Sequence, residues 1–172
     1  MKRLKKVTIY SDGGCRPTNP GPGGYGAVLL YGEHRKELSG GYRLTTNNRM
    51  ELTAAIAGLE ALKAPCDVIL YTDSQYLVNA MDNGWAARWQ ANNWRRSEKE
   101  KAKNPDLWER LLTAAERHKV KFIWVKGHAG ITENERCDVL ATAAAVRQDL
   151  PVDEAYEEFL RVQEEEAANS AS

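Results

Sequence analysis

The sequence predicts an α/β fold with a mixed five-stranded sheet, three antiparallel strands then two parallel ones, flanked by helices. Three observations predict it. β-rich segments cluster in the first third of the chain. A short apolar run in the middle is typical of a strand buried on both faces, and stretches of helical spacing surround the later strands. The expected order β-β-β-α-β-α-α-α-β-α joins an antiparallel meander to strands that pair in parallel across helical crossovers.

The first three strands are predicted at residues 7–12, 25–31 and 36–44. Between the first two, residues 13–24 contain five glycines and three prolines, which is a composition typical of turns. Residues 45–48 then offer helix-capping side chains, and leucine, isoleucine and alanine follow at helical spacing. We therefore expect a hairpin-rich sheet followed by its first helix, which ends before Pro65.

The second half of the chain alternates between helical and strand patterns. The apolar run 68–72 is the buried strand, and Asp73-Ser74 can cap a helix to about Met81. The remaining pattern gives a helix at 107–118, a strand at 120–125, a loop at 126–132 and a helix at 134–147. After Pro151 we expect a short acidic amphipathic segment and a disordered end. This organisation is one domain over residues 1–148 and an acidic tail over 149–172.

Composition limits the function classes. The 172 residues suit one domain, and no apolar run approaches the roughly 20 residues of a membrane helix. The basic start lacks the apolar core of a signal peptide, so we expect a cytoplasmic protein without membrane contact. The odd set Cys15, Cys66 and Cys137 argues against disulfides and structural zinc. The tail from residue 149 carries −7, and because the whole chain is neutral the body carries +7.

Four acids lie where such sheets place their chemistry. Asp12 and Asp73 end two predicted strands, and ligands of α/β sheets bind outside the carboxyl ends of strands. Glu51 and Asp138 lie in the first turns of two predicted helices. Singly, each acid also fits a turn, a cap or the positive end of a helix. Together they would repel one another unless cations lay among them, and oxygen ligands suit Mg²⁺ or Mn²⁺.

A histidine lies in a glycine-flanked loop, in the stretch Lys126-Gly127-His128-Ala129-Gly130. The sequence leaves two interpretations open. His128 is either an ordinary surface histidine or a group that transfers protons near neutral pH.

Residues 85–103 combine tryptophans with cations. Trp85, Trp89 and Trp94 are three of the five tryptophans, and six bases against two acids give the segment a charge of +4. Flat rings suit sugars and bases while cations suit phosphates, so we favour a nucleic-acid-binding segment. A helix packed by its tryptophans, with a solvated charged face, is the alternative.

Several long motifs occur along the chain in an order that is typical of one protein family. They are DGGC at 12–15, NPGPGGYGA at 19–27, TTNNRMEL at 45–52, TDSQY at 72–76, the tryptophan and basic segment, and KGHAG with NERCD within 126–138. On these motifs the chain closely resembles the bacterial type 1 ribonuclease H family across about 150 residues. The resemblance implies a ribonuclease H-like fold and an endonuclease that cuts the RNA strand of RNA–DNA hybrids. It implies 5′-phosphate and 3′-hydroxyl products.

The resemblance also implies roles for individual residues. Asp12, Glu51, Asp73 and Asp138 would bind metal, namely two Mg²⁺ ions for which Mn²⁺ may substitute, in a two-metal mechanism with His128 assisting proton transfer or product release. Asn134 would support the active-site loop. The implied contacts to substrate fall into a groove facing the RNA (Cys15, Asn19, Asn47, Asn48 and Gln75), a surface facing the DNA strand (Trp89 and Ser97, with Trp85 and Trp94 in the basic segment) and a DNA-phosphate pocket (Thr46 and Asn104). We expect a monomer.

Three departures from the family pattern stand out. The turn RPTNPG carries one extra residue, which puts the place of Asn19 in doubt. Leu44 stands where the pattern has an arginine of the phosphate pocket, and Arg43 precedes it. The acidic tail lies outside the resemblance and could either compete with nucleic acid for the basic body or add solubility.

Three other function classes compete with a hybrid-specific nuclease. A catalytically silent binding module would have no reason to keep four acids. A resolvase-like nuclease for branched DNA does not need the basic segment or the TTNN stretch. A Rossmann-type nucleotide binder would need G-x-G-x-x-G opening a helix, whereas a strand follows the glycines here.

Overall fold

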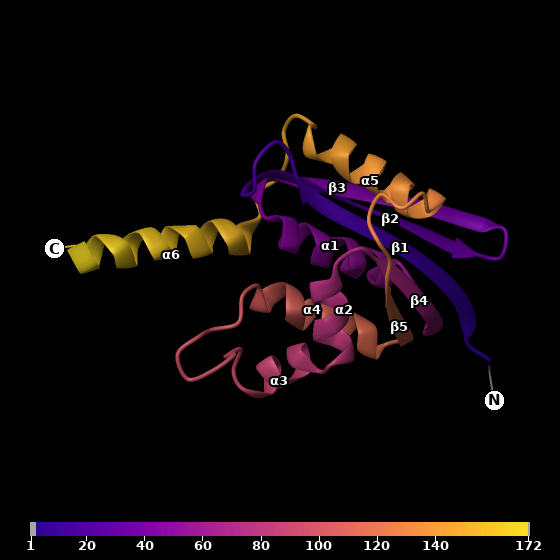
Figure 1. Ribbon diagram of the computed structural model, residues 1–172, viewed down its shortest axis with the longest axis horizontal. Helices are drawn as coiled ribbons and strands as arrows, with labels where there is room; N and C mark the ends of the chain where they lie inside the picture. Colours follow the sequence, from indigo (N-terminus) through magenta and orange to yellow (C-terminus); the bar gives the residue numbers. More distant parts are fainter. Residues whose placement is uncertain (1–2, 172) are drawn as a thin grey trace.

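A five-stranded sheet organises the computed structural model, which describes residues 3–171 (Figure 1). The strands are β1 (Lys5–Cys15), β2 (Gly21–Tyr31), β3 (His34–Thr45), β4 (Cys66–Thr72) and β5 (Lys119–Trp124). They lie in the order β3-β2-β1-β4-β5. The pairs β1–β2 and β2–β3 are antiparallel, and the pairs β1–β4 and β4–β5 are parallel. The predicted mixed sheet is confirmed.

Helices cover both faces of the sheet (Figure 1). Within residues 3–171 they are α1 (Asn47–Glu60), α2 (Gln75–Asp82), α3 (Trp85–Ala91), α4 (Pro105–Glu116), α5 (Thr132–Ala145) and α6 (Glu154–Ala171). The main core lies between the sheet and the α1 side, where Ile9, Leu52, Ile56, Leu70 and Trp108 are almost fully buried. α5 lies alone on the opposite face. None of these helices is both long enough and apolar enough to cross a bilayer.

The glycine-rich stretch that the sequence predicts as a turn is mostly strand. β1 continues to Cys15 and β2 begins at Gly21, so only residues 16–20 connect them. The reason is close packing. A Cβ at Gly24 would lie 2.0 Å from the carbonyl oxygen of Ala141 on α5, and one at Gly13 would lie 2.4 Å from the backbone of Met50 on α1. The glycines let both helices rest directly on strand backbone.

The tail also differs from the expected short amphipathic segment and disordered end. Residues beyond 148 pack on the body: the Pro151 carbonyl accepts a 2.9 Å hydrogen bond from the Arg43 amide, and Asp153 and Tyr156 are buried. From there α6 extends away from the sheet as one helix (Figure 1). Ion pairs one turn apart on its surface, which the composition alone did not reveal, support it.

Candidate active site and nucleic-acid surface

Two acids meet at the carboxyl edge of the parallel strands. The register between β1 and β4 ends at the pair Ser11 and Thr72, so Asp12 and Asp73 are the next residues on neighbouring strands that run in the same direction. β1 itself continues beyond this point, because Asp12 still pairs with Gly26 of β2. The predicted end of the first strand at Asp12 is therefore wrong by three residues. The carboxylates are brought together all the same.

Three further side chains reach the same place from other elements. Glu51 comes from α1, Asp138 from α5 and His128 from the loop between β5 and α5. With Asp12 and Asp73 they line one cavity of about 190 Å³, whose other lining residues are Gly13, Gly14, Arg16, Asn47, Ala141 and Thr142. All five side chains predicted to act in catalysis thus face a single cavity.

The loop before α5 needs glycine at one position. A Cβ at Gly127 would lie 2.8 Å from Oδ2 of Asp73, so a larger residue would displace this carboxylate from its position in the cluster. The next residue, His128, has a φ of 57° and an exposed side chain. The glycine therefore places the histidine beside the acids.

The structural alternatives for the two strand acids do not hold. Ser74, rather than Asp73, caps α2: its hydroxyl accepts a 3.2 Å hydrogen bond from the Leu77 amide. Asp12 lies within a strand and accepts a 2.9 Å hydrogen bond from the Gly13 amide. Oδ1 of Asp73 is buried and has no hydrogen-bond partner. A buried oxygen without a partner is costly, which indicates a role in binding a ligand.

Crowding raises the pKa of these acids. Burial, followed by repulsion from Asp73 and Asp138, raises the pKa of Asp12 to about 8. Burial raises the pKa of Glu51 to about 7, although a hydrogen bond from Ser74 opposes the shift. Burial likewise raises the pKa of Asp73. Near neutral pH the cluster therefore retains protons that a bound cation would displace.

The donor set fits a hard divalent cation. Four carboxylates, one of which has a buried oxygen without a partner (Oδ1 of Asp73), offer the ligands that Mg²⁺ and Mn²⁺ prefer. In the described part of the chain, no three His, Cys, Asp or Glu side chains lie in an arrangement that could hold a metal ion as it stands. The fit therefore rests on the oxygen ligands of the cluster and on the repulsion between its carboxylates, which a cation would relieve.

The sequence reasoning missed one cation in the site. Arg16 lines the cavity, and its Nη2 lies 3.4 Å from Oδ1 of Asp138. Both side chains are partly exposed, so the ion pair is weak and can open when substrate binds. Its position directly after the DGGC motif is the one signal that pointed to it.

Three of the residues predicted to face the RNA are joined by hydrogen bonds, and one of them, Asn47, lines the cavity. The side-chain oxygen of Asn47 accepts a 2.7 Å hydrogen bond from the Cys15 amide, and the Asn47 amide donates to Oδ1 of Asn19 at 3.0 Å. Cys15 is buried, whereas Asn19 is exposed. Asn48 and Gln75 are also exposed, at the starts of α1 and α2.

The basic segment is part core and part open surface. Trp89 is only 8% exposed and packs against Trp108, with ring centroids 5.7 Å apart and planes at 70°. Trp85 and Trp94 are half-buried. An open cavity of about 570 Å³ lies here, lined by Tyr76, Trp85, Arg88, Trp89, Ala91, Asn92, Arg95 and Arg96. The packing alternative is confirmed for Trp89, whereas nucleic-acid binding by the open, arginine-lined part of the segment stays a prediction.

Four remaining residues have defined surroundings. Ser97 is exposed, and its hydroxyl accepts from the Lys99 and Glu100 amides. Thr46 caps α1, and Asn104 precedes α4 with a φ of 58°. Asn134 is buried on α5, and its side-chain oxygen has no hydrogen-bond partner.

The sheet order and its acidic edge define an α/β protein with its chemistry at the carboxyl ends of parallel strands. The family model for RNase H matches residues 4–146, so the chain belongs to the ribonuclease H family, a family of enzymes. A ribonuclease H from Syntrophus aciditrophicus is 68% identical over 152 residues, covering 88% of this chain and 87% of that protein. One from Desulforamulus reducens is 66% identical over 150 residues, covering 87% and 94%.

Solved structures share the architecture. LC9-RNase H1, described as a type 1 RNase H with the type 2 active-site motif, has a TM-score of 0.77 and 30% identity, covering 92% of this chain and 82% of its own. LC11-RNase H1 in complex with an RNA/DNA hybrid has a TM-score of 0.61 and 22% identity, covering 87% and 99%. The second likeness is one of fold alone.

Proposed function

We propose that the protein is an endonuclease that hydrolyses the RNA strand of RNA–DNA hybrids, with Mg²⁺ as cofactor. One observation carries the proposal: Asp12, Glu51, Asp73, Asp138 and His128 line a single cavity at the carboxyl edge of the sheet. The basic segment and the asparagine-rich edge beside Cys15 supply surfaces for a duplex. Membership of the ribonuclease H family supports the same reaction.

The acids would bind two Mg²⁺ ions, or Mn²⁺ in their place, once they lose the protons that their raised pKa values retain near neutral pH. When bound, the ions supply positive charge that stabilises the transferring phosphate and help water to attack it. His128 lies beside Asp73 on an accessible loop and would give a proton to the leaving 3′ oxygen, which becomes the 3′-hydroxyl of the product. The expected products carry a 5′-phosphate and a 3′-hydroxyl.

Recognition of a hybrid follows from its shape. The wide minor groove of an A-like duplex exposes 2′-hydroxyls on the RNA strand, and polar side chains such as Asn47, Asn48 and Gln75 can bond them. Trp85 and the arginines of the basic segment would contact the sugars and phosphates of the DNA strand. These contacts depend on shape and not on base sequence.

The test uses one labelled RNA strand alone, paired with DNA and paired with RNA. Each is incubated with the protein, with Mg²⁺ or with a chelator, beside an Asp73→Asn variant. The proposal expects cleavage of the hybrid only, dependent on metal and lost in the variant. Hybrid binding without cleavage would indicate the silent module instead. Cleavage of all three RNAs would refute the assignment of the groove and basic segment, and a branched DNA substrate tests the resolvase-like alternative.

A further inference from the structure

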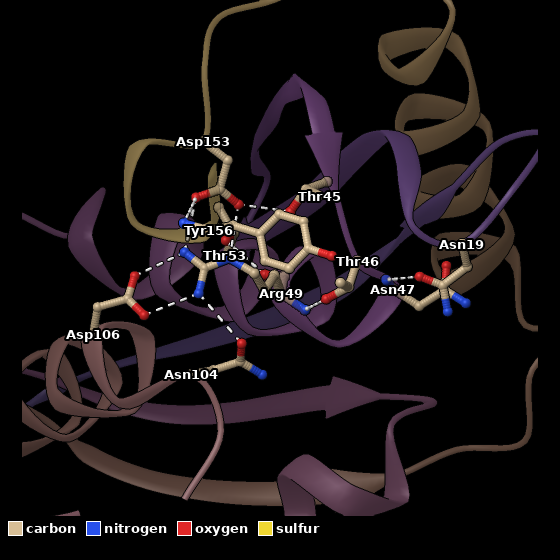
Figure 2. Close-up of polar contacts among 10 residues, drawn as sticks. All are labelled: Asn19, Thr45, Thr46, Asn47, Arg49, Thr53, Asn104, Asp106, Asp153 and Tyr156. Atoms are coloured by element: carbon tan, nitrogen blue, oxygen red, sulfur yellow. Dashed lines mark hydrogen bonds and ion pairs between the residues drawn. The ribbon is translucent and has the colours of Figure 1, made fainter. Parts of the chain in front are cut away.

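The guanidinium of Arg49 is buried where α1, α4 and the start of α6 meet (Figure 2). All five of its N–H groups have acceptors. Nε and Nη2 donate to the two oxygens of Asp153 at 2.7 and 2.9 Å. Nη1 and Nη2 donate to the two oxygens of Asp106 at 2.9 and 2.8 Å, and Nη1 also donates to Oδ1 of Asn104 at 3.3 Å. Arg49 therefore has no donor left for a ligand and acts through the groups that it holds.

Arg49 fixes the orientation of Asn104. A guanidinium has donors only, so the carboxamide must turn its oxygen toward Arg49 and its NH₂ group away. Thr46 is oriented independently of the guanidinium, because as the N-cap of α1 its hydroxyl oxygen accepts a 3.2 Å hydrogen bond from the backbone amide of residue 49. The O–H of Thr46 is then free to donate elsewhere. Two neutral side chains thus keep their donors for a ligand.

The arginine that the family pattern has at this place is absent, and its neighbour is engaged. Leu44 stands where the family pattern has an arginine, and the neighbouring Arg43 is bound by both oxygens of Glu157 on α6, at 2.9 and 2.8 Å. A phosphate that binds beside Thr46 would thus depend on well-aimed neutral donors more than on a free positive charge. The affinity for such a phosphate would then depend mainly on the orientation of the Asn104 carboxamide.

We propose that Arg49 is a positioning residue whose guanidinium aims Asn104 at a phosphate of the DNA strand, beside the N-cap Thr46, and that Asp106 and Asp153 hold Arg49 in place. The inference rests on the proposed hybrid substrate. Asp153 precedes α6 and also accepts a 2.7 Å hydrogen bond from the Thr45 hydroxyl, next to Thr46. The first residues of the acidic tail are thereby part of the substrate site.

The chain offers a matched control for the ion pair between Arg49 and Asp106. That pair joins α1 to α4 with two hydrogen bonds, and the Asp106 side chain is 39% exposed. Glu60 and Arg110 also join α1 to α4 with two hydrogen bonds, and the Glu60 side chain is 40% exposed. Loss of either acid removes two hydrogen bonds between the same helices, but only Asp106 touches the group that orients Asn104. The arginines differ, since the Arg49 side chain is 5% exposed and that of Arg110 is 51% exposed, so Glu60→Gln controls for the link between the helices and thermal unfolding controls for the buried charge.

The experiment measures cleavage of a set of hybrids in which one DNA phosphate at a time is replaced by an uncharged methylphosphonate. Wild type, Asp106→Asn, Asp153→Asn and Glu60→Gln are compared, each after thermal unfolding has shown it folded at the assay temperature. For wild type we expect one position whose replacement raises KM about fivefold with little change in kcat. Asp106→Asn and Asp153→Asn should raise KM for the unmodified hybrid by about the same factor. They should also lose the response at that position, while Glu60→Gln keeps it.

The outcomes separate this inference from the proposed function. Wild type that cleaves hybrids but shows no sensitive DNA position would overturn the phosphate pocket and leave the nuclease intact. If both Asp106→Asn and Asp153→Asn retain the position-specific response, or if Glu60→Gln loses it as fully as they do, Arg49 has a structural role only. Wild type that cleaves no hybrid at all refutes the proposed function itself.

Discussion

Replacing Asp12 with asparagine should stabilise the protein even though it should abolish cleavage. Burial and the neighbouring acids raise the pKa of Asp12 to about 8. A carboxyl group whose pKa is raised by folding costs stability progressively as the pH rises from its unfolded pKa to its folded pKa. Asparagine carries no charge at any pH, and its side-chain oxygen can still accept the hydrogen bond from the Gly13 amide.

The magnitude follows from the two pKa values. The unfolded chain ionises Asp12 near its ordinary pKa of 3.8, whereas the folded protein retains the proton until about pH 8. At pH 7 this difference costs at most about 4 kcal/mol, since each pH unit above the unfolded pKa is worth about 1.36 kcal/mol. Solvent in the open cavity screens the repulsion, so we expect Asp12→Asn to raise the free energy of unfolding by about 2 kcal/mol.

Urea unfolding followed by circular dichroism, in chelator, measures this difference between about pH 4 and about pH 8. The gain should be near zero at the acidic end and grow toward the alkaline end. Glu109→Gln, an exposed position on α4, should show no such growth. Added Mg²⁺ should reduce the difference in free energy of unfolding between Asp12→Asn and wild type, because it stabilises wild type alone. A gain that is absent at pH 7, or that does not vary with pH, would refute the assignment of repulsion to this cluster.

Three further predictions concern the tail, the basic segment and a buried thiol. Asp153→Asn should lower the free energy of unfolding by about 2 kcal/mol in urea, because Arg49 loses a buried partner, whereas Glu158→Gln on the solvent face of α6 removes only an exposed ion pair and should change the midpoint far less. Trp85→Ala, measured below its unfolding temperature because Trp85 also packs against the core, should weaken hybrid binding about fivefold in fluorescence anisotropy at low salt. An unchanged Kd would contradict its contact role. Burial raises the pKa of Cys137 to about 12, so a thiol reagent should label it only after unfolding.

Periodic patterns predicted the sheet, and the predicted strand ends placed Asp12 and Asp73 at one of its edges. The apolar run that became β4 and the helical spacing of α1 depend on local burial, which sequence periodicity reports directly. The prediction of a turn at 13–24 was wrong because the glycines of this stretch let α1 and α5 approach the strand backbone closely. That contact exists only in the folded chain. Trp89 shows the same limit, since its spacing fits both a binding surface and the core contact with Trp108 that the structure has.

Long-range ion pairs lay beyond reach of the sequence. Arg49 and Asp153 are 104 positions apart, and although Arg49 belongs to the TTNNRMEL motif, nothing in the sequence pairs it with Asp153. Arg16 was overlooked for the same reason, because its partner Asp138 comes from the far end of the chain. Composition gives the number of charged residues but not which of them form ion pairs. The tail shows this most clearly, because its composition gives a single charge of −7, whereas some of its acids pair with arginines of the body and others do not.

The structure divides that tail into two parts with different roles. Asp153 and Glu157 bind arginines of the body, whereas Glu164, Glu165 and Glu166 are exposed on the outer half of α6. A chain cut at residue 149 would remove both parts and disturb Arg49.

A chain ending at Gln163 removes only the outer acids and tests whether they compete with nucleic acid, because the contacts of Asp153 and Glu157 stay in place. We expect its hybrid affinity at low salt to equal that of the full chain, because the outer helix points away from the sheet (Figure 1). Tighter binding that disappears at high salt would show that the outer acids compete for the basic body.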